Sequence, residues 1–336
     1  MSPKILVFGA GSLGTVYLWF LSRASSQVDI TAVCRSNYDA ALRNGFTVNS
    51  ELWGSGYHVR PRVVRSVPEA VRQAESQPFD YIVVTAKALR TTPSTAELIR
   101  PAITPGKTAV VLIQNGIAIE EEYVRCYAGD DVPLLSAVAY CPATQTAPAV
   151  VSHGEIEHLY LGTYPARGVP ETHKQAARNF VELLESGGSA AILSDDVQEQ
   201  RWSKLLVNGA WNPICALTRL RDMQYVNIGE GDGTDNEIVM FVRDVMLEIA
   251  SIAQACGYES INERTVDYQI ARATARSGDG IEPSMLADAL AQRTLEVESI
   301  VGNAVLIAQV KNVPVPLLRT IYLLAKGLSA SYALKK

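Results

Sequence analysis

A glycine-rich sequence follows the first apolar run of the chain and is the strongest constraint on its fold. In order, its residues are Gly9, Ala10, Gly11, Ser12, Leu13 and Gly14. The G-x-G-x-x-G spacing between a strand and a helix is typical of folds that bind dinucleotides. Gly9 permits a tight turn, Gly11 lets the backbone approach a pyrophosphate, and Gly14 lets the helix pack closely against the strand. All six residues are therefore predicted to bind a cofactor. A glycine-rich turn without a ligand is the alternative.

The second residue after the second predicted strand, residues 28–33, indicates which nicotinamide cofactor is bound. This position usually holds Asp or Glu, which binds the ribose 2′-hydroxyl of NADH. Here the residue is Arg35. Because a guanidinium binds phosphate through two hydrogen bonds, Arg35 predicts the 2′-phosphate of NADPH, which a carboxylate would repel. A surface arginine without a ligand is the alternative.

The first half of the chain alternates β-branched apolar runs with helical patterns, as in a parallel sheet covered by helices. The apolar runs are residues 5–8, 28–33, 81–85, 109–113 and 134–139. We therefore predict an α/β fold whose N-terminal, Rossmann-type dinucleotide-binding domain covers residues 1–194. Two further short strands between residues 151 and 162 predict an antiparallel extension at a sheet edge.

From residue 195 onward the apolar residues recur at helical spacing. The segments with this pattern are residues 196–220, 236–256, 284–311 and 316–330. They predict a C-terminal all-α domain over residues 195–336, whose polar residues, described below, are the candidates for the substrate and catalytic site. Asp235 is expected to cap the second of these helices. The sequence assigns no role to the glycine-rich stretch 229–235 or to segment 50–66.

Length and composition exclude several classes of protein. A chain of 336 residues favours two domains. Its 30 Lys and Arg residues against 35 Asp and Glu argue against nucleic-acid binding. No run reaches the roughly 18 apolar residues that span a membrane. The five cysteines are scattered and no metal-ligand spacing occurs, so we expect no disulfide framework, no metal and a cytoplasmic location.

Three polar residues, Lys204, Asn208 and Asn212, follow one another at intervals of four in the helical half. On an α-helix this spacing places all three on one face. Their neighbours are apolar, so these groups need polar partners, which a cleft with a bound ligand would provide. A solvated helix face is the alternative. Pro213 predicts a kink near Asn212.

The order and spacing of these motifs resemble the ketopantoate reductase (2-dehydropantoate 2-reductase) family over nearly the whole chain. The matching sequences are residues 9–14, Arg35, Thr85-Ala86-Lys87-Ala88, Gln114-Asn115-Gly116, the Lys204/Asn208/Asn212 helix, and residues 283–288 followed by Glu296. The resemblance implies an NADP-dependent oxidoreductase of pantothenate biosynthesis. It would reduce a small 2-keto acid to a 2-hydroxy acid with NADPH, ketopantoate being the default substrate.

The resemblance also implies a role for each matching residue. Lys204 is the implied proton donor, because hydride transfer to a ketone leaves an alkoxide that an ammonium group can stabilise and protonate. The implied substrate-binding residues are Asn115, Lys204, Asn208, Asn212 and Ser284. Besides the glycine-rich turn and Arg35, the implied cofactor contacts are Lys87, Asn115 and Glu296.

Each of these residues has a simpler interpretation. Ser284 follows a proline and can cap its own helix. Glu296 can pair with Arg293 one turn back, which is a weak surface interaction. Lys87 can face solvent at a strand end, and Asn115 with the glycine after it is a common turn dipeptide.

Some residues depart from the family pattern. Segment 50–66 is longer than the family's usual connection, and residues 219–222 replace a stretch where the family often presents another substrate-binding asparagine. Trp211 also places a large ring beside Asn212. These differences leave two alternatives: a reductase of another ketone or imine in secondary metabolism, and a non-catalytic NADP-binding sensor. The long apolar helices near the C-terminus can form a homodimer surface.

Overall fold

The structure is a computed structural model that describes residues 2–75, 77–231 and 233–334. Its internal contacts divide the chain into two units. Unit 1 comprises Met1–Lys87, Thr91–Gln114 and Ile119–Val197, and unit 2 comprises Ala88–Arg90, Asn115–Ala118 and Gln198–Lys336. Two short segments from the first half of the chain therefore make most of their contacts with the helical half. None of the described helices is long and apolar enough to cross a membrane.

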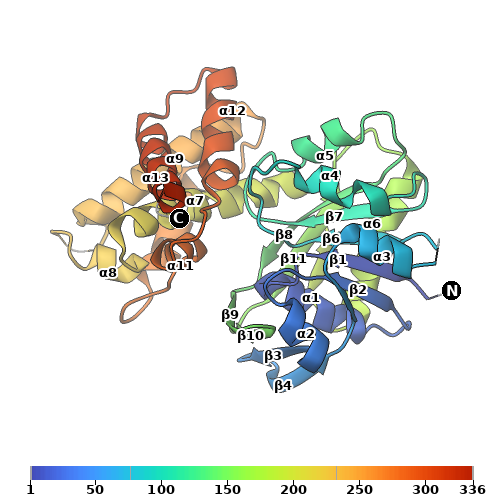
Figure 1. Cartoon of the computed structure of the whole chain (residues 1–336). Helices are drawn as coiled ribbons and strands as arrows, with labels where there is room; N and C mark the ends of the chain where they lie inside the picture. Colours follow the sequence, from blue (N-terminus) through green and yellow to red (C-terminus); the bar gives the residue numbers. More distant parts are fainter. Residues whose placement is uncertain (1, 76, 232, 335–336) are drawn as a thin grey trace. The chain divides into compact units, whose positions relative to one another are not determined.

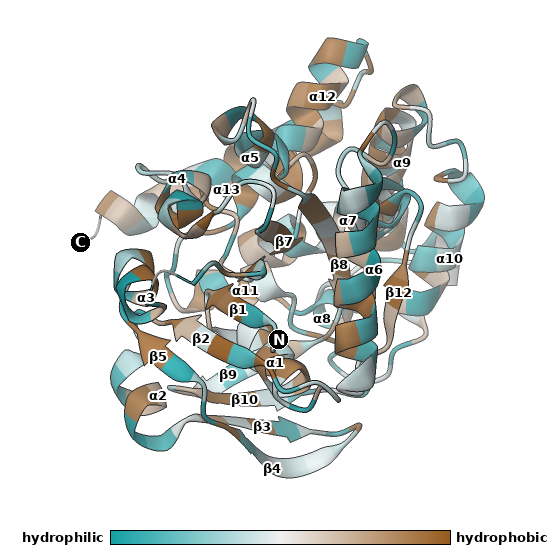
Figure 2. Ribbon diagram, turned by 90° about the vertical axis from the view of Figure 1, so that its right-hand side faces the viewer, coloured by the Kyte–Doolittle hydropathy of each residue, from teal (hydrophilic) through white to brown (hydrophobic). Residues whose placement is uncertain are grey.

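Unit 1 is built on an eight-stranded sheet with the order β12-β11-β8-β7-β6-β1-β2-β5 (Figure 1). Its strands are β1 (Lys4–Phe8), β2 (Asp29–Val33), β5 (Arg62–Val64), β6 (Tyr81–Val84), β7 (Ala109–Ile113), β8 (Leu134–Tyr140), β11 (His158–Thr163) and β12 (Ala191–Leu193). Six neighbouring strands of this sheet, β8, β7, β6, β1, β2 and β5, are parallel to one another. On the other side of β8 the sheet continues with β11, which pairs with β8 in antiparallel orientation. Helices cover the parallel part, so its strands are continuous apolar runs, drawn in brown for β7 and β8 in Figure 2.

A second sheet of four strands, in the order β4-β3-β10-β9, lies next to helix α1 (Ser12–Ser22). Its strands are β3 (Phe46–Ser50), β4 (Gly54–Val59), β9 (Ala143–Ala147) and β10 (Val150–His153). Trp19 of α1 packs against Trp53 and Tyr57, with ring centroids 4.9 and 4.8 Å away, and Trp53 stacks on His153 at 4.4 Å. Segment 50–66 thus supplies part of the cover of α1, which is buried along most of its length.

The antiparallel extension expected between residues 151 and 162 is strand β11. The strand before it, β10, pairs instead with β3 and β9 in the second sheet. The chain changes sheets at Glu157, which is buried. Its carboxylate accepts hydrogen bonds from the Ala190 N–H at 2.7 Å and the Ser189 hydroxyl at 2.9 Å.

The other helices of unit 1 flank these sheets. They are α2 (Tyr38–Asn44), α3 (Val67–Gln73), α4 (Thr95–Ile99), the 3₁₀ turn Arg100–Ala102, α5 (Glu121–Cys126) and α6 (Glu171–Ser186). Helix α6 packs its apolar side on the sheet, where Phe180 is fully buried and lies 4.9 Å from the Tyr81 ring. Together these elements form the predicted Rossmann-type half of an α/β fold.

Unit 2 is helical, as predicted. Its helices are α7 (Val197–Thr218), α8 (Asp222–Val226), α9 (Glu237–Ala255), α10 (Glu263–Thr274), α11 (Ser284–Leu290), a π-helical turn (Glu298–Gly302), α12 (Asn303–Lys311) and α13 (Pro316–Leu334). The core includes Val242, Met246 and Ile249 of α9, all fully buried. The segment 284–311, whose apolar residues recur at helical spacing, is not one continuous helix: α11 ends at Leu290, and Gln292 then adopts a left-handed φ of 52°.

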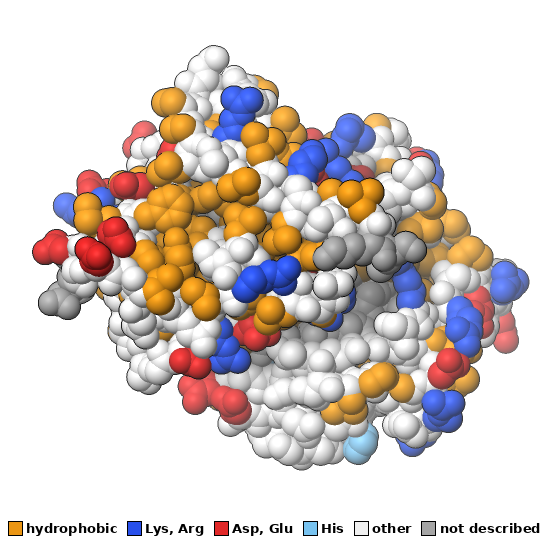
Figure 3. Space-filling model, turned by 60° about the vertical axis from the view of Figure 1, so that its left-hand side comes forward, with side chains coloured by type: hydrophobic (Ala, Val, Ile, Leu, Met, Phe, Trp, Pro, Cys, Tyr) orange, Lys and Arg blue, Asp and Glu red, His pale blue; other side chains and the backbone are white. Residues whose placement is uncertain are grey.

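Apolar side chains also remain on the surface, and Figure 3 shows them gathered on part of one face. On α13 the exposed leucines are Leu323, Leu324 and Leu334. They are consistent with the homodimer surface expected from the sequence, which stays a prediction.

The cap of α9 differs from the one expected. The side-chain oxygen of Asn236 accepts hydrogen bonds from the Ile238 and Val239 N–H groups, at 3.0 and 3.2 Å. Asp235 is not the cap, because it belongs to the 3₁₀ turn Gly233–Asp235, and the extended backbone needed for capping falls one residue later.

Replacing Asn236 with Ala should lower the free energy of unfolding by about 1 kcal/mol, because two N–H groups lose their acceptor. Urea unfolding followed by circular dichroism measures the change. The matched variant Asp235→Ala should change it by no more than a few tenths of a kcal/mol. Equal effects of the two substitutions would contradict this assignment of the cap.

Candidate functional site

The glycine-rich turn of unit 1 is packed too tightly for side chains at two positions. Gly9 has a φ of 103°, and a Cβ atom there would lie 2.3 Å from the Ala86 nitrogen. A Cβ on Gly14 would lie 2.4 Å from the Gly9 carbonyl oxygen. Gly11 differs, since a Cβ there would meet no atom within 4 Å. Packing explains the first and third glycines, whereas Gly11 borders open space that a ligand can occupy.

The N-terminus of α1 is available to an anion. No side chain caps this helix and its first turn contains no acidic residue. The Gly11 N–H bonds to the Gly9 oxygen at 2.8 Å, and Ser12 and Leu13 are half-buried. The first N–H groups of a helix carry partial positive charge and commonly bind phosphate. The structure thus has an uncapped helix N-terminus at the glycine-rich turn, and the binding of a cofactor there stays a prediction.

Strands β1, β2 and β6 end in register at the same edge of the sheet. Phe8 of β1 lies opposite Val33 of β2 and Val84 of β6. The chain therefore leaves these strands side by side, toward the glycine-rich turn, Arg35 and Lys87. Such an edge is where open parallel sheets bind their ligands.

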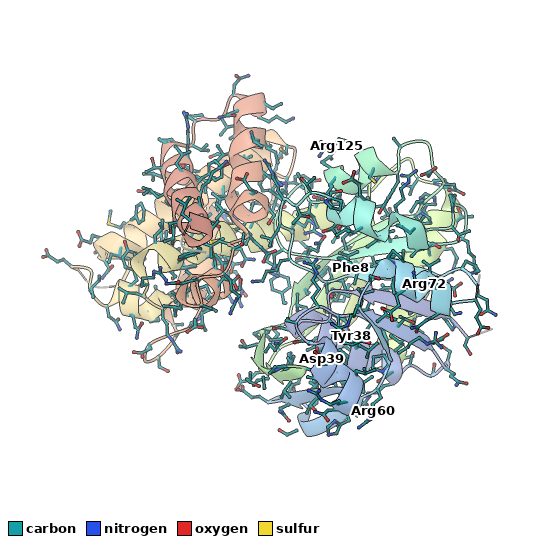
Figure 4. The ribbon with its side chains drawn as sticks, viewed as in Figure 1. Phe8, Tyr38, Asp39, Arg60, Arg72 and Arg125 are labelled. Carbon is teal, nitrogen blue, oxygen red and sulfur yellow. The ribbon has the colours of Figure 1, made fainter. Side chains whose placement is uncertain are left out.

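Arg35 and Lys87 are both exposed at this edge. Within the described part of the chain, the Arg35 side chain makes no hydrogen bond or ion pair. Asn37 ties its loop to the glycine-rich turn by donating to the Ala10 oxygen at 2.7 Å. Nearby, the Arg65 guanidinium lies 3.8 Å from the Tyr38 ring centroid; Figure 4 labels Tyr38.

In unit 2, helix α7 presents the polar residues predicted to share one face. Lys204 is half-buried, and its Nζ donates a hydrogen bond to Asn115 Oδ1 at 2.8 Å. Asn208 is also half-buried, and its amide makes no hydrogen bond with any described residue. Helix α7 continues through Pro213 to Thr218. A cation and an unpaired amide therefore lie one turn apart on α7.

Asn212, the third residue of this face, is buried and has a structural contact. Its Oδ1 accepts hydrogen bonds from the Met285 N–H at 3.1 Å and the Ser284 hydroxyl at 3.2 Å. Helix α11 has no cap of its own, so Ser284 does not cap it. These bonds direct the Asn212 oxygen toward α11. Its Nδ2 has no hydrogen-bond partner among the described residues.

Glu296 precedes the π-helical turn and is buried. Its Oε1 accepts a hydrogen bond from the Ala88 N–H at 2.9 Å. Arg293, the partner suggested by the simpler interpretation, instead pairs with Asp288 at 2.9 Å. Glu296 thus holds the backbone directly after Lys87.

Each unit gathers its own set of the predicted residues. Unit 1 contains the glycine-rich turn, Arg35 and Lys87, and unit 2 contains Asn115, Lys204, Asn208, Asn212, Ser284 and Glu296. Among the residues that the structure describes, no group of three His, Cys, Asp or Glu could hold a metal ion. The arrangement in unit 2 offers an ammonium group and amides to a polar, anionic ligand.

One residue at the site was missed by the sequence analysis. Arg201 is 3% exposed, and its Nη1 donates a hydrogen bond to the Gly116 carbonyl at 3.1 Å. The only signal in the sequence is its position three residues before Lys204 on the same helix. That spacing does not show whether an arginine is buried.

Replacing Asn212 with Ala should speed hydrogen exchange at the start of α11 about 10-fold, because the Met285 N–H loses its acceptor. Exchange measured by mass spectrometry on peptides containing Met285 gives the rate. Asn208→Ala is the matched control on the same helix face, since it removes no hydrogen bond to α11. Unchanged exchange in Asn212→Ala would show that this bond does not hold the helix.

Comparisons with known proteins cover almost the whole chain. The family described as Ketopantoate reductase PanE/ApbA matches residues 5–166, and its C-terminal domain, described as Ketopantoate reductase PanE/ApbA C terminal, matches residues 196–329. An uncharacterised protein of Saccharomyces cerevisiae is 30% identical over 338 residues, which cover 95% of this chain and 91% of the relative.

Two 2-dehydropantoate 2-reductases are also similar. The protein from Nostoc sp. is 24% identical over 327 residues, covering 95% of this chain and 93% of the relative. The crystal structure of the protein from Methylococcus capsulatus matches with a TM-score of 0.80 and 30% identity, and the match covers 98% of both chains.

Proposed function

The chain belongs to the ketopantoate reductase family of oxidoreductases that act on CH–OH groups, and on this premise we propose that it reduces a 2-keto acid with NADPH. Ketopantoate is the first candidate substrate and pantoate the product. The observation that carries the proposal is the 2.8 Å hydrogen bond from Lys204 to Asn115, on the helix face that also bears Asn208 and Asn212. Residues 1–194 would supply most of the cofactor contacts, and residues 195–336 would supply most of the substrate contacts.

The residues of unit 1 fit a dinucleotide. Gly9 and Gly14 leave no room for side chains in the turn, and the N-terminus of α1 is free to bind a pyrophosphate. Arg35 would bind the 2′-phosphate, which favours NADPH over NADH. Lys87 would add a second cation, and Glu296 would contact the ribose. When bound, the cofactor supplies the hydride that reduces the carbonyl carbon.

In unit 2, Lys204 would hold at Nζ the proton that the new alkoxide takes up. Asn115 accepts a hydrogen bond from this ammonium and orients it. The free amide of Asn208 and the Asn212 Nδ2 would donate to the substrate, since the Asn212 oxygen is already engaged by α11. The two amide donors suit a carboxylate. The Ser284 hydroxyl donates its proton to the Asn212 oxygen, so its own oxygen would accept from a hydroxyl group of the substrate.

A second candidate is the same reaction on another ketone or imine. The observation that favours it concerns residues 219–222. Arg219 donates to the Tyr332 hydroxyl at 2.9 Å, and the buried Asp222 carboxylate forms an ion pair with the half-buried Arg276. These side chains serve packing within unit 2, and the bulky Trp211 is buried beside Asn212. The substrate contacts would therefore differ from those usual in the family.

The substrate is identified by measuring NADPH oxidation with a panel of 2-keto acids that includes ketopantoate. We expect turnover of at least one 2-keto acid. Tight NADPH binding without oxidation across the panel would overturn the proposed activity and favour the non-catalytic sensor.

Replacing Lys204 with Met should lower kcat for the active substrate at least about 100-fold, because the alkoxide loses its proton donor. NADPH affinity, measured by fluorescence titration, should stay within about 3-fold, since Lys204 is not assigned to the cofactor. Lys311→Met removes an exposed lysine of α12 and should leave kcat unchanged. Full activity in Lys204→Met would reject Lys204 as the donor.

Replacing Arg35 with Asp should weaken NADPH binding about 10- to 100-fold or more while changing NADH binding little, because only NADPH carries the 2′-phosphate. Dissociation constants for both cofactors test this difference. Arg72→Asp, on the exposed end of α3, introduces the same charge change as a control. Equal weakening of NADPH and NADH by Arg35→Asp would contradict the assignment.

A further inference from the structure

The loop 115–118 is held by unit 2 although it follows strand β7 of unit 1. Gly116 has a φ of 107°, and a Cβ there would lie 2.3 Å from the Ser299 carbonyl oxygen. The next side chain, Ile117, is 2% exposed and belongs to the helical core. The loop therefore packs on the helices so closely that its backbone has little freedom to shift.

Three elements of unit 2 hold the backbone of this loop. Arg201 of α7 donates to the Gly116 carbonyl at 3.1 Å. In the π-helical turn the Ser299 carbonyl accepts from the Ile117 N–H at 2.9 Å, and on α12 the Asn303 Nδ2 donates to the Ile117 carbonyl at 2.8 Å. These bonds engage backbone groups, so the Asn115 side chain remains available for Lys204.

Helix α7 binds the loop at two adjacent points. Lys204 donates to the side-chain oxygen of Asn115, and Arg201 donates to the backbone oxygen of Gly116. The two cations are three residues apart, so they lie one helical turn apart on neighbouring positions of α7. A charge-assisted hydrogen bond is stronger than a neutral one, and the planar guanidinium fixes its direction.

Burial makes this contact of Arg201 more than a surface interaction. A guanidinium that is 3% exposed destabilises a protein unless hydrogen bonds compensate its lost hydration. One of those bonds is made to the residue after Asn115. The buried charge of Arg201 therefore bears on where the Asn115 amide lies relative to Lys204, although Arg201 is not one of the motif residues Lys204, Asn208 and Asn212.

We propose that Arg201 is a positioning residue for the reduction: by holding the Gly116 carbonyl it sets the place of Asn115, and Asn115 in turn orients the proton of Lys204. This inference rests on the proposed function, because it assigns Lys204 as the proton donor. Arg201 itself touches neither substrate nor cofactor in this assignment.

The test compares Arg201→Met with Arg201→Lys in the full-length protein. In Arg201→Met, kcat should fall about 10- to 100-fold, which corresponds to losing one charge-assisted hydrogen bond. KM and the NADPH dissociation constant should stay within about 3-fold, and the pH profile of kcat should shift. Arg201→Lys should restore part of kcat, since an ammonium can still donate to the carbonyl.

Two further variants separate positioning from folding. Asn303→Ala removes the bond to the Ile117 carbonyl without leaving a buried charge unpaired, and it should lower kcat in the same manner but less. Arg264→Met removes an exposed arginine of α10 and should change nothing. An unchanged kcat and pH profile in Arg201→Met, or a loss that appears in KM alone, would overturn the proposal.

Hydrogen exchange of the 115–118 segment supplies a readout that needs no substrate. Exchange should be faster in Arg201→Met and Asn303→Ala than in the parent protein and in Arg264→Met. If the parent protein reduces no 2-keto acid, the proposed function fails while faster exchange still establishes that Arg201 holds the loop. Unchanged exchange in Arg201→Met would reject the holding role even in an active enzyme.

Discussion

The candidate site depends on the attachment of a four-residue loop to helix α7. Asn115 follows a strand of the Rossmann-type half, but its loop belongs by contact to the helical unit. The close approach of Gly116 to the Ser299 carbonyl permits this attachment, since any side chain there would collide with backbone. Arg201 and Lys204 then bind adjacent oxygens of the loop. As a result, the proposed proton donor and its amide partner are held within one packed unit.

The cofactor side depends on a different constraint, the register of parallel strands. Strands β1, β2 and β6 end opposite one another, so the residues that follow them emerge at one edge. Gly9 lets the turn approach Ala86 after β6, and Asn37 ties the loop after β2 back to the turn. The edge thus combines a helix N-terminus with Arg35 and Lys87. Local positive charge there suits an anionic cofactor even though the chain carries a net charge of -5.

Most of the architecture could be predicted because its signals are local and periodic. Buried parallel strands are uninterrupted apolar runs, and helices repeat their apolar residues at helical spacing. The errors occur where the outcome depends on a single backbone angle or on distant packing. Asn236 rather than Asp235 caps α9 because a 3₁₀ turn occupies the earlier residue. Similarly, α11 ends at Leu290 and Gln292 then adopts a left-handed φ, which no pattern in the sequence predicts.

The candidate residues show the same division. The glycine-rich turn, Arg35 and the Lys204/Asn208/Asn212 face could be identified from sequence because spacing alone places each set on one turn or one helix face. Only the tertiary structure shows that Asn115 accepts a hydrogen bond from Lys204, 89 positions further along the chain. It also shows that Arg201 donates a hydrogen bond to the Gly116 carbonyl, next to Asn115. A third contact of this kind is the hydrogen bond that the Asn212 side-chain oxygen accepts from the Met285 N–H of α11. Hydrogen bonds between residues so far apart leave no periodic pattern in a sequence, since they form only once the chain has packed.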